Sequence, residues 1–236
     1  MPDGELEIRT LDSAAEMAAI VTVFQQVWGS VTPIVGVELL RAISHAGGYV
    51  AGAFESGNIV GASFGVLARH QGSDALHSHV TGILPGVQHS GVGRAMKSHQ
   101  RRWAAVRGIP WITWTYDPLV RRNAWFNIEV LGAHIAEYLV NFYGPMTDSI
   151  NAQDETDRLV VAWPTDETAP RPAAPAGTSR IEVPTPVDIV VLRRTDQTAA
   201  MGWRHRVRDQ LAPLLARGGV VTGFTREGSY VVHVPD

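Results

Sequence analysis

Two histidines stand one residue apart in a segment, residues 76–84, that reads as a β-strand. Because side chains alternate across a strand, His77 and His79 are predicted to share one face. Ser78 and Val80 are predicted to face the opposite way. A neutral imidazole titrates near ~6.5 and can accept a proton at neutral pH, so the pair could supply a general base. Two other interpretations stay open: structural residues of a cleft wall, or half of a metal site with no third ligand apparent.

A glycine-containing loop follows the strand after Pro85, which ends it because proline has no N–H for a ladder. The loop opens a predicted helix, and its sequence is Gln88, His89, Ser90, Gly91, Val92, Gly93 and Arg94. The first N–H groups of a helix lack internal partners and carry partial positive charge. Gly91 and Gly93 keep side chains away from that backbone. The loop is therefore predicted to hold a phosphate or pyrophosphate, the alternative being a tight turn that binds nothing. Its spacing matches neither a Walker loop nor G-x-G-x-x-G.

The helix after the loop is predicted from apolar residues at helical spacing. These core-facing residues are Ala95, Met96, His99, Trp103 and Val106. The basic residues of the same stretch are predicted to lie largely on the wetter side of the helix. They are Arg94, Lys97, Arg101 and Arg102.

The elements around this stretch follow from alternation, helical spacing and turn residues. Strands are predicted at residues 5–11, 49–54, 59–69, 76–84, 111–116, 134–143 and 158–163. Helices are predicted at residues 13–28, 37–45, 95–107 and 121–131, the first with a capping box formed by Ser13 and Glu16. The predicted order is β-α-α-β-β-β-α-β-α-β-β.

In this order, Ile83-Leu84-Pro85 followed by Q-x-x-G-x-G-x-A resembles the acyl-CoA-binding motif of the GNAT N-acyltransferase superfamily, and the resemblance covers residues 5–164. It implies an α/β (α+β) fold with a GNAT-type mixed, mostly antiparallel sheet flanked by helices. It also implies that the backbone of Ile83 and Leu84 contacts the pantetheine arm of acyl-CoA, while residues 88–94 hold its pyrophosphate. The segments ITWTYDP, RRNAWFN, NFYGPMTDSIN and TDRLVVAW resemble one bacterial branch of this superfamily.

The resemblance extends to candidate catalytic residues. The H-x-H pair is similar to a histidine pair on the same strand of serotonin N-acetyltransferase, which implies His77 as the base and His79 as a relay or substrate contact. Many GNAT enzymes place an acidic tyrosine where this chain has Ile128. Tyr116, Tyr138 and Tyr143 are the candidates to replace it, and Tyr143 is the one we predict.

The helix at residues 121–131 normally flanks the pantetheine arm in this superfamily. Asn123 and Asn127 are therefore predicted to contact acyl-CoA. For Asn123, helix capping is the alternative role.

The composition limits the remaining possibilities. The chain has 236 residues, a formal net charge of −3 and no cysteine. The slight negative charge argues against nucleic acid as a partner, and no apolar run long enough to span a membrane is present. The absence of cysteine excludes disulfides and thiolate sites. A cytoplasmic location and no metal ion are expected.

The C-terminal third differs in composition from the rest. Residues 165–179 are rich in Pro and Ala and predict a linker. They separate a GNAT acyl-CoA-binding domain at residues 1–164 from a small βαββ module at residues 180–236. The module is predicted to have a strand at 187–192, a helix at 196–216 and a terminal hairpin, and to dock on the first domain or on a partner subunit of a homodimer.

Two functions follow from the sequence. The first is an acyl-CoA-dependent N-acyltransferase, in the first place an N-acetyltransferase, acting on a small amine or amino acid by direct transfer through a ternary complex. Acetyl-CoA or another acyl-CoA would be the cosubstrate. The alternative is a catalytically weak or inactive CoA-binding or interaction protein, which the missing tyrosine favours.

Overall fold

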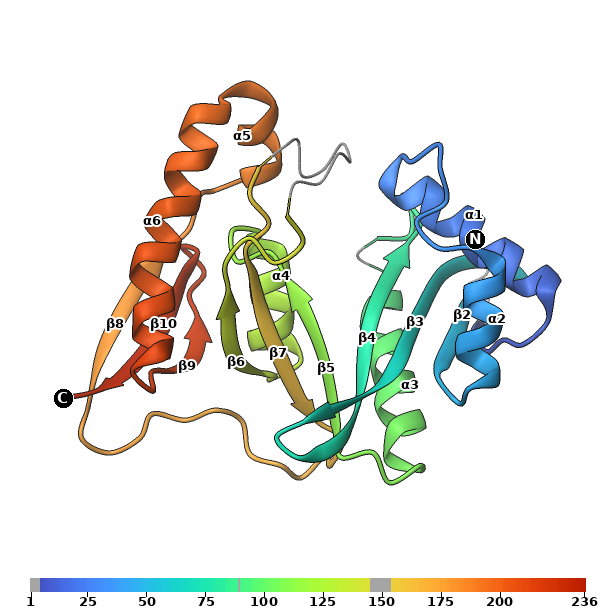
Figure 1. The fold of residues 1–236 in the computed structure, drawn as a ribbon, viewed down its shortest axis with the longest axis horizontal. Helices are drawn as coiled ribbons and strands as arrows, with labels where there is room; N and C mark the ends of the chain where they lie inside the picture. Colours follow the sequence, from blue (N-terminus) through green and yellow to red (C-terminus); the bar gives the residue numbers. More distant parts are fainter. Residues whose placement is uncertain (1–4, 89, 145–153) are drawn as a thin grey trace. The chain divides into compact units, whose positions relative to one another are not determined.

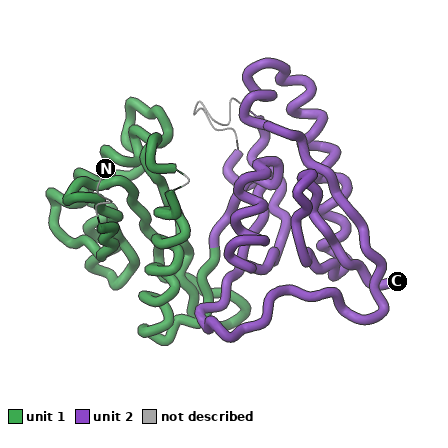
Figure 2. The backbone as a smooth tube through the Cα atoms, turned by 180° about the vertical axis from the view of Figure 1, so that it is seen from behind, with its two compact units in different colours: residues 1–113 green, residues 114–236 purple. Residues whose placement is uncertain are grey.

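The structure, a computed structural model, describes residues 5–88, 90–144 and 154–236. In these residues it has a larger, mixed and mostly antiparallel sheet of strand order β1-β2-β3-β4-β5-β7-β6 and a smaller sheet of order β8-β10-β9 (Figure 1). This confirms the predicted fold class. The chain divides into two compact units, Met1–Thr113 and Trp114–Asp236, which we call unit 1 and unit 2 and describe in turn (Figure 2). None of the helices in the described residues is long and apolar enough to cross a membrane.

Unit 1 contains the elements in the order that the sequence predicts. They are β1 (Leu6–Thr10), α1 (Ala14–Trp28), α2 (Val37–His45), β2 (Tyr49–Glu55), β3 (Asn58–His70), β4 (Ser73–Ile83), α3 (Val92–Ala105) and the first half of β5 (Trp111–Tyr116). β1 to β4 pair in succession as antiparallel neighbours. The start of β5 runs parallel to β4, where Ala75–His77 lie opposite Trp111–Thr113.

Local sequence signals explain where the first helix begins and ends. The Ser13 side chain accepts from the N–H of Glu16 at 3.2 Å, and the Glu16 carboxylate accepts from the N–H of Ser13 at 3.1 Å. This reciprocal pair is the predicted capping box, and it satisfies two amide groups that the helix itself leaves open. The helix ends at Gly29, which has a φ of 60°, a conformation that favours glycine.

Helices cover both faces of the unit 1 sheet. Gly82 faces Phe24 and Trp28 of α1, whereas the next residue, Ile83, packs with Met96 of α3. Since consecutive strand residues point to opposite faces, α1 and α3 lie on opposite sides of β4. Each face buries its own apolar cluster, so β4 is held between two packed layers.

Unit 2 contains the rest of β5 and all later elements. They are α4 (Arg121–Trp125), a π-helix η1 (Phe126–Val130), β6 (His134–Leu139), β7 (Arg158–Pro164), β8 (Thr178–Pro184), α5 (Ile189–Thr195), α6 (Gln197–Ala216), β9 (Val220–Phe224) and β10 (Ser229–Pro235). α4 and η1 together occupy the predicted helix at residues 121–131. β6 ends four residues earlier than predicted, at Leu139.

One predicted element of the C-terminal module is wrong. Residues 187–192 were expected to form a strand, because they are rich in β-branched residues, but they lie largely in α5. The Asp188 carboxylate accepts from the N–H groups of Val190 and Val191 at 2.9 and 3.0 Å. This cap fixes a helix start and overrides the local strand preference. The first strand of the module is instead β8, so the module has two helices between its strands.

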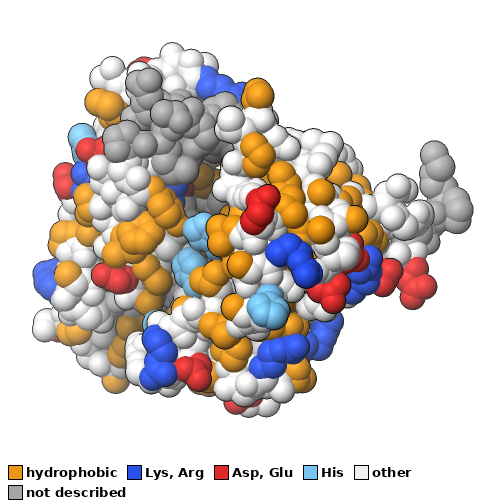
Figure 3. Space-filling view, turned by 45° about the vertical axis from the view of Figure 1, so that its right-hand side comes forward, with side chains coloured by type: hydrophobic (Ala, Val, Ile, Leu, Met, Phe, Trp, Pro, Cys, Tyr) orange, Lys and Arg blue, Asp and Glu red, His pale blue; other side chains and the backbone are white. Residues whose placement is uncertain are grey.

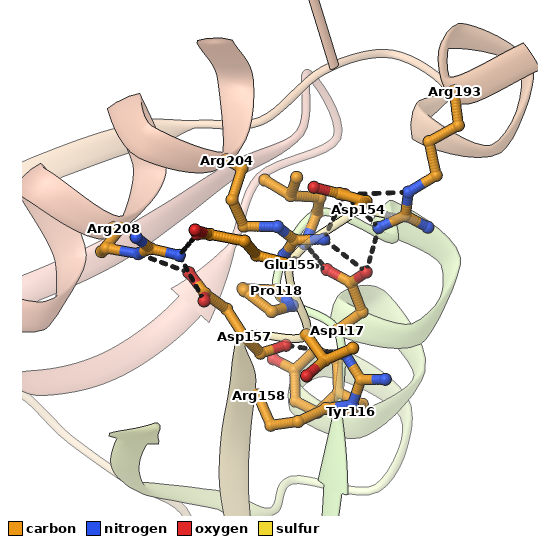
Figure 4. A network of polar contacts seen from close by, with 12 residues as sticks. Tyr116, Asp117, Pro118, Asp154, Glu155, Asp157, Arg158, Arg193, Arg204 and Arg208 are labelled. Atoms are coloured by element: carbon orange, nitrogen blue, oxygen red, sulfur yellow. Dashed lines mark hydrogen bonds and ion pairs between the residues drawn. The ribbon is translucent and has the colours of Figure 1, made fainter. Parts of the chain in front are cut away.

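A buried network of charges joins the C-terminal helices to the end of β5 within unit 2 (Figure 4). Arg204 of α6 donates to both oxygens of Asp117, at 2.8 and 2.9 Å, and to Asp154 at 2.8 Å. Arg193 of α5 contacts the same two carboxylates. Both arginine side chains are at most 2% exposed. The two arginines hold the pKa of Asp117 well below its usual range, although burial alone would raise it.

Replacing Arg204 with Met should destabilise the protein by about 3–5 kcal/mol, because two buried carboxylates lose a partner while Arg193 can compensate only in part. Urea unfolding followed by circular dichroism measures this. Arg206→Met is the matched control: Arg206 is exposed and lies 4.4 Å above the Trp203 ring, a contact worth about 0.5–1 kcal/mol. Equal losses in the two variants would contradict a special role for the buried network.

Candidate functional site

The strand that carries the two histidines is bulged at His79. In the pairing of β3 with β4, Phe64 lies opposite Val80 and Gly65 lies opposite Ser78, so His79 is an extra residue. The predicted alternation is therefore wrong beyond this point, and Val80 packs into the apolar cluster that contains Phe64. The buried Ser63 hydroxyl donates to the Val80 carbonyl at 3.0 Å. A bulge bends a strand and redirects its side chains, and such bulges are frequent near active sites.

The two histidine rings lie together, as the sequence predicts. Their centroids are 5.9 Å apart, and the His79 ring is 5.4 Å from the Phe64 ring. The His77 Nδ1 atom lies 3.3 Å from the Thr113 hydroxyl, so that hydroxyl can fix the orientation of the imidazole. His77 is half-buried and His79 is exposed. Figure 3 shows histidine side chains at the surface beside apolar ones.

Both imidazoles favour the neutral form. Burial lowers the pKa of His77 below 6.5, and the charges of His79 and Lys97 lower it further. His79 is exposed overall, but the partial burial of its ring also lowers its pKa. A neutral imidazole is the form that accepts a proton, so His77 can serve as a base at neutral pH.

Lys97 is buried, which corrects the expectation that it lies on the wetter side of α3. Its side chain faces β4, and Nζ donates to the Ser78 hydroxyl at 2.9 Å and to the Gln100 side-chain oxygen at 3.2 Å. Burial lowers its pKa to about 7. The sequence contained no signal for this position, because a lysine among four basic residues on a helix is usually solvated.

The glycine loop leaves the N-terminus of α3 open. Gly91 is the N-cap residue, with a φ of 91°, and in the described part of the chain no side chain caps the helix. The first turn contains no acidic residue. Val92 is 1% exposed and anchors the turn in an apolar cluster. The Ser90 hydroxyl bonds to the Val87 carbonyl at 2.6 Å, so this side chain stabilises the loop itself.

The two glycines leave open space in front of the N-terminus of α3. Among the described residues, a Cβ atom added to Gly91 would meet nothing within 4 Å, and one added to Gly93 would meet only Ile83, at 4.0 Å. Uncapped helical N–H groups with open space before them fit a phosphate or pyrophosphate group. The exposed Arg94 stands at the same end of the helix.

The end of β4 is tied to the loop. The Gln88 side chain donates to the Ile83 carbonyl at 3.2 Å. The Leu84 N–H donates to the Val60 carbonyl at 2.9 Å, so it is occupied by the sheet. His89, which was also predicted to bind acyl-CoA, lies outside the described residues. The backbone contacts of Ile83 and Leu84 with pantetheine stay a prediction.

The other predicted site residues belong to unit 2. Tyr143 is 42% exposed, and its hydroxyl lies 3.2 Å from the Thr115 hydroxyl. The Asn127 side chain is buried and accepts from the Trp114 indole at 3.2 Å, which gives it a structural role. Asn123 is half-buried on α4. Ile128 is a core residue, 6% exposed. The roles of Tyr143, Asn123 and Asn127 toward acyl-CoA stay predictions.

We expect the imidazoles of both His77 and His79 to titrate below pH ~6.5, the ordinary value for histidine, because burial disfavours the charged form. NMR of the ring Cε1–Hε1 groups across pH 4–9 measures the midpoints, with single His→Gln variants to assign the signals. A midpoint above the ordinary value for His77 would contradict this description of the site.

Solved structures of known proteins share the fold of this chain. No family model matches the sequence, and no curated protein matches it. Among solved structures, the ribosomal-protein-S18-alanine N-acetyltransferase from Escherichia coli is similar, with a TM-score of 0.55 and 16% identity over 70% of this chain and 97% of that one. A GNAT-family protein from Desulfovibrio desulfuricans has a TM-score of 0.54 and 17% identity over 68% and 99%. A chain of the NatC complex bound to Gag peptide and CoA has a TM-score of 0.53 and 12% identity over 68% and 98%. The fold of this chain is therefore that of the GNAT acetyltransferases, as its strand–loop–helix motif predicts.

Proposed function

We propose that the protein is an acyl-CoA-dependent N-acyltransferase that acetylates the amine of a small molecule or amino acid. The observation that carries the proposal is the open N-terminus of α3, which follows directly from the bulged strand that holds His77 and His79. The GNAT fold supports it, since a similar structure contains bound CoA. Fold alone does not define function, so the argument rests on the residues.

The loop supplies the site for the pyrophosphate of acyl-CoA. The N–H groups of Val92, Gly93 and Arg94 stand in the first turn of α3, where the helix dipole favours negative charge. Gly91 and Gly93 add no side chain to the space before them. Acyl-CoA would contribute an activated thioester, and the protein would contribute its orientation and the proton acceptor.

His77 is proposed to take the proton from the acceptor amine. An alkylammonium has a pKa near ~10 and is not a nucleophile until it loses a proton. His77 is kept neutral by burial, and Thr113 fixes its ring. His79 lies close enough to relay the proton or to contact the substrate. The C–N bond then forms and the C–S bond breaks, and the second proton of the attacking nitrogen passes to the leaving thiolate or to solvent, which leaves a neutral amide and free CoA.

A second function is favoured by one observation. Ile128, at the place where related enzymes have a tyrosine acid, is a core residue and offers no proton. A CoA-binding protein without acyltransferase activity would also fit this feature. CoA release measured over a panel of amines, together with calorimetric binding of CoA, separates the two: binding without turnover on any amine supports the second function.

Replacing Gly93 with Leu should weaken CoA binding by at least ~10-fold, or about 1.4 kcal/mol, because the side chain would fill the space before the helix N-terminus. Gly93 is a cleaner test than Gly91, whose positive φ would add backbone strain to any substitution. Gly202→Leu, at an open position of α6, is the matched control. Parental CoA affinity in a folded Gly93→Leu protein would reject the loop as the cofactor site.

Replacing His77 with Ala should lower kcat/KM by roughly 10²–10⁴-fold, the usual contribution of a positioned base. In the parent, kcat/KM should rise with pH through a midpoint below ~6.5, because only the neutral imidazole accepts a proton; this limb should vanish in the variant. His45→Ala, an exposed histidine of α2, serves as control. A His77→Ala, His79→Ala double variant with parental turnover and pH profile would leave the pair as structural residues.

A further inference from the structure

Lys97 reaches the histidine strand from the opposite side of the sheet. Ser78 lies between His77 and His79 in the chain, and side-chain alternation turns it toward α3 while the two imidazoles face away. Its hydroxyl accepts a hydrogen bond from Lys97 Nζ at 2.9 Å. Ser78 is 4% exposed and Lys97 is 7% exposed, so this bond is sheltered from water.

The bond is made at the residue where the strand leaves its regular register. Ser78 is paired with Gly65, and the extra residue, His79, follows it directly. Bulged strands have weaker ladders at the bulge, because one residue lacks a partner across the sheet. A buried side-chain bond at Ser78 therefore constrains the position of both neighbouring histidines.

We propose that Lys97 is a positioning residue for His77: through Ser78 it holds the bulged strand in place, and its ammonium acts on the His77 imidazole from across the strand. The importance of this contact for catalysis rests on the function proposed above. The hydrogen bond between Lys97 and Ser78 does not, and neither does the effect of the Lys97 charge on His77, so both can be tested separately.

The described residues place several groups around Lys97 and His77. On β4, the charge of His79 lowers the pKa of His77. The first half of β5 contributes the uncharged Thr113 hydroxyl, and β3 pairs with His77 through Val66. On the α3 side, Gln100 accepts from Lys97. His99, two residues after Lys97 on α3, is hydrogen-bonded to Tyr49 of β2 at 2.8 Å.

The electrostatic part of the proposal has a defined sign. Burial brings the pKa of Lys97 to about 7, so the ammonium is largely charged in the pH range where His77 gains its proton. A positive charge nearby opposes that protonation. Removing the charge should therefore raise the pKa of His77. The pKa of His79 is lowered by burial, so His79 should move much less.

The experiment is an NMR titration of the histidine rings in the full-length protein and in two variants. Lys97→Met removes the charge and the hydrogen bond, and Lys97→Gln removes the charge but keeps a donor for Ser78. Both should shift the His77 midpoint to higher pH and leave His79 and His99 near their parental values. Equal upward shifts of His77 and His79 would indicate general loosening of the fold and would overturn the proposal, as would an unchanged His77 midpoint.

Kinetics test the positioning part. With CoA release as the readout, Lys97→Met should lose up to ~10²-fold in plateau kcat/KM, the cost of misplacing a catalytic group by about 1 Å. Lys97→Gln should recover most of that loss while its pH limb stays shifted upward. Equal plateau losses in the two variants would refute positioning through Ser78. If CoA binds but no amine is acetylated, the proposed function fails, whereas the NMR titration still decides on the contact.

Discussion

Strand β4 contains one residue more than β3 can pair, and the site in unit 1 depends on where that residue stands. The register shifts at His79, so the strand bends between Ser78 and Val80. Hydrogen bonds stabilise the residues before and after His79. The Ser63 hydroxyl donates to the Val80 carbonyl, and Lys97 Nζ donates to the Ser78 hydroxyl. The imidazoles of His77 and His79 are thus held by a packed sheet and not by a loop, and the proton transfer that we propose would require such a fixed position.

The protein uses two different ways of keeping charge in its interior. In unit 2, Asp117 and Asp154 form ion pairs with Arg193 and Arg204, so each buried charge has an opposite neighbour (Figure 4). In unit 1, Lys97 donates hydrogen bonds to the hydroxyl of Ser78 and the side-chain oxygen of Gln100, and burial lowers its pKa to about 7. Ion-paired groups fix the structure, whereas a buried group whose pKa lies near neutrality can gain or lose its charge as the pH changes.

The two glycines of the loop are present for different physical reasons. Gly91 is required by the backbone, since its φ of 91° is unfavourable for other residues. Gly93 has no such requirement, and its small size matters only for what can approach the helix from outside. A glycine that the backbone does not need, at an uncapped helix start with no acidic residue, is the part of the loop that points most directly to an anionic ligand.

Much of unit 1 could be predicted from the sequence, because its signals are local. The capping box at Ser13, the turn at Gly91 and the spacing of His77 and His79 each depend on residues a few positions apart. The same local reasoning failed at residues 187–192, where a single Asp188 cap outweighed a run of β-branched residues.

Other features were decided by tertiary structure alone. The bulge at His79 depends on the register with β3, so it could not be predicted from the residues of β4. Lys97 is buried only because α3 packs with that side against Ser78. The pairing of Asp117 with Arg204 joins residues 87 positions apart. Burial and charge are properties of the packed neighbourhood, so sequence spacing determined which groups are available, while tertiary packing determined their partners and their affinity for protons.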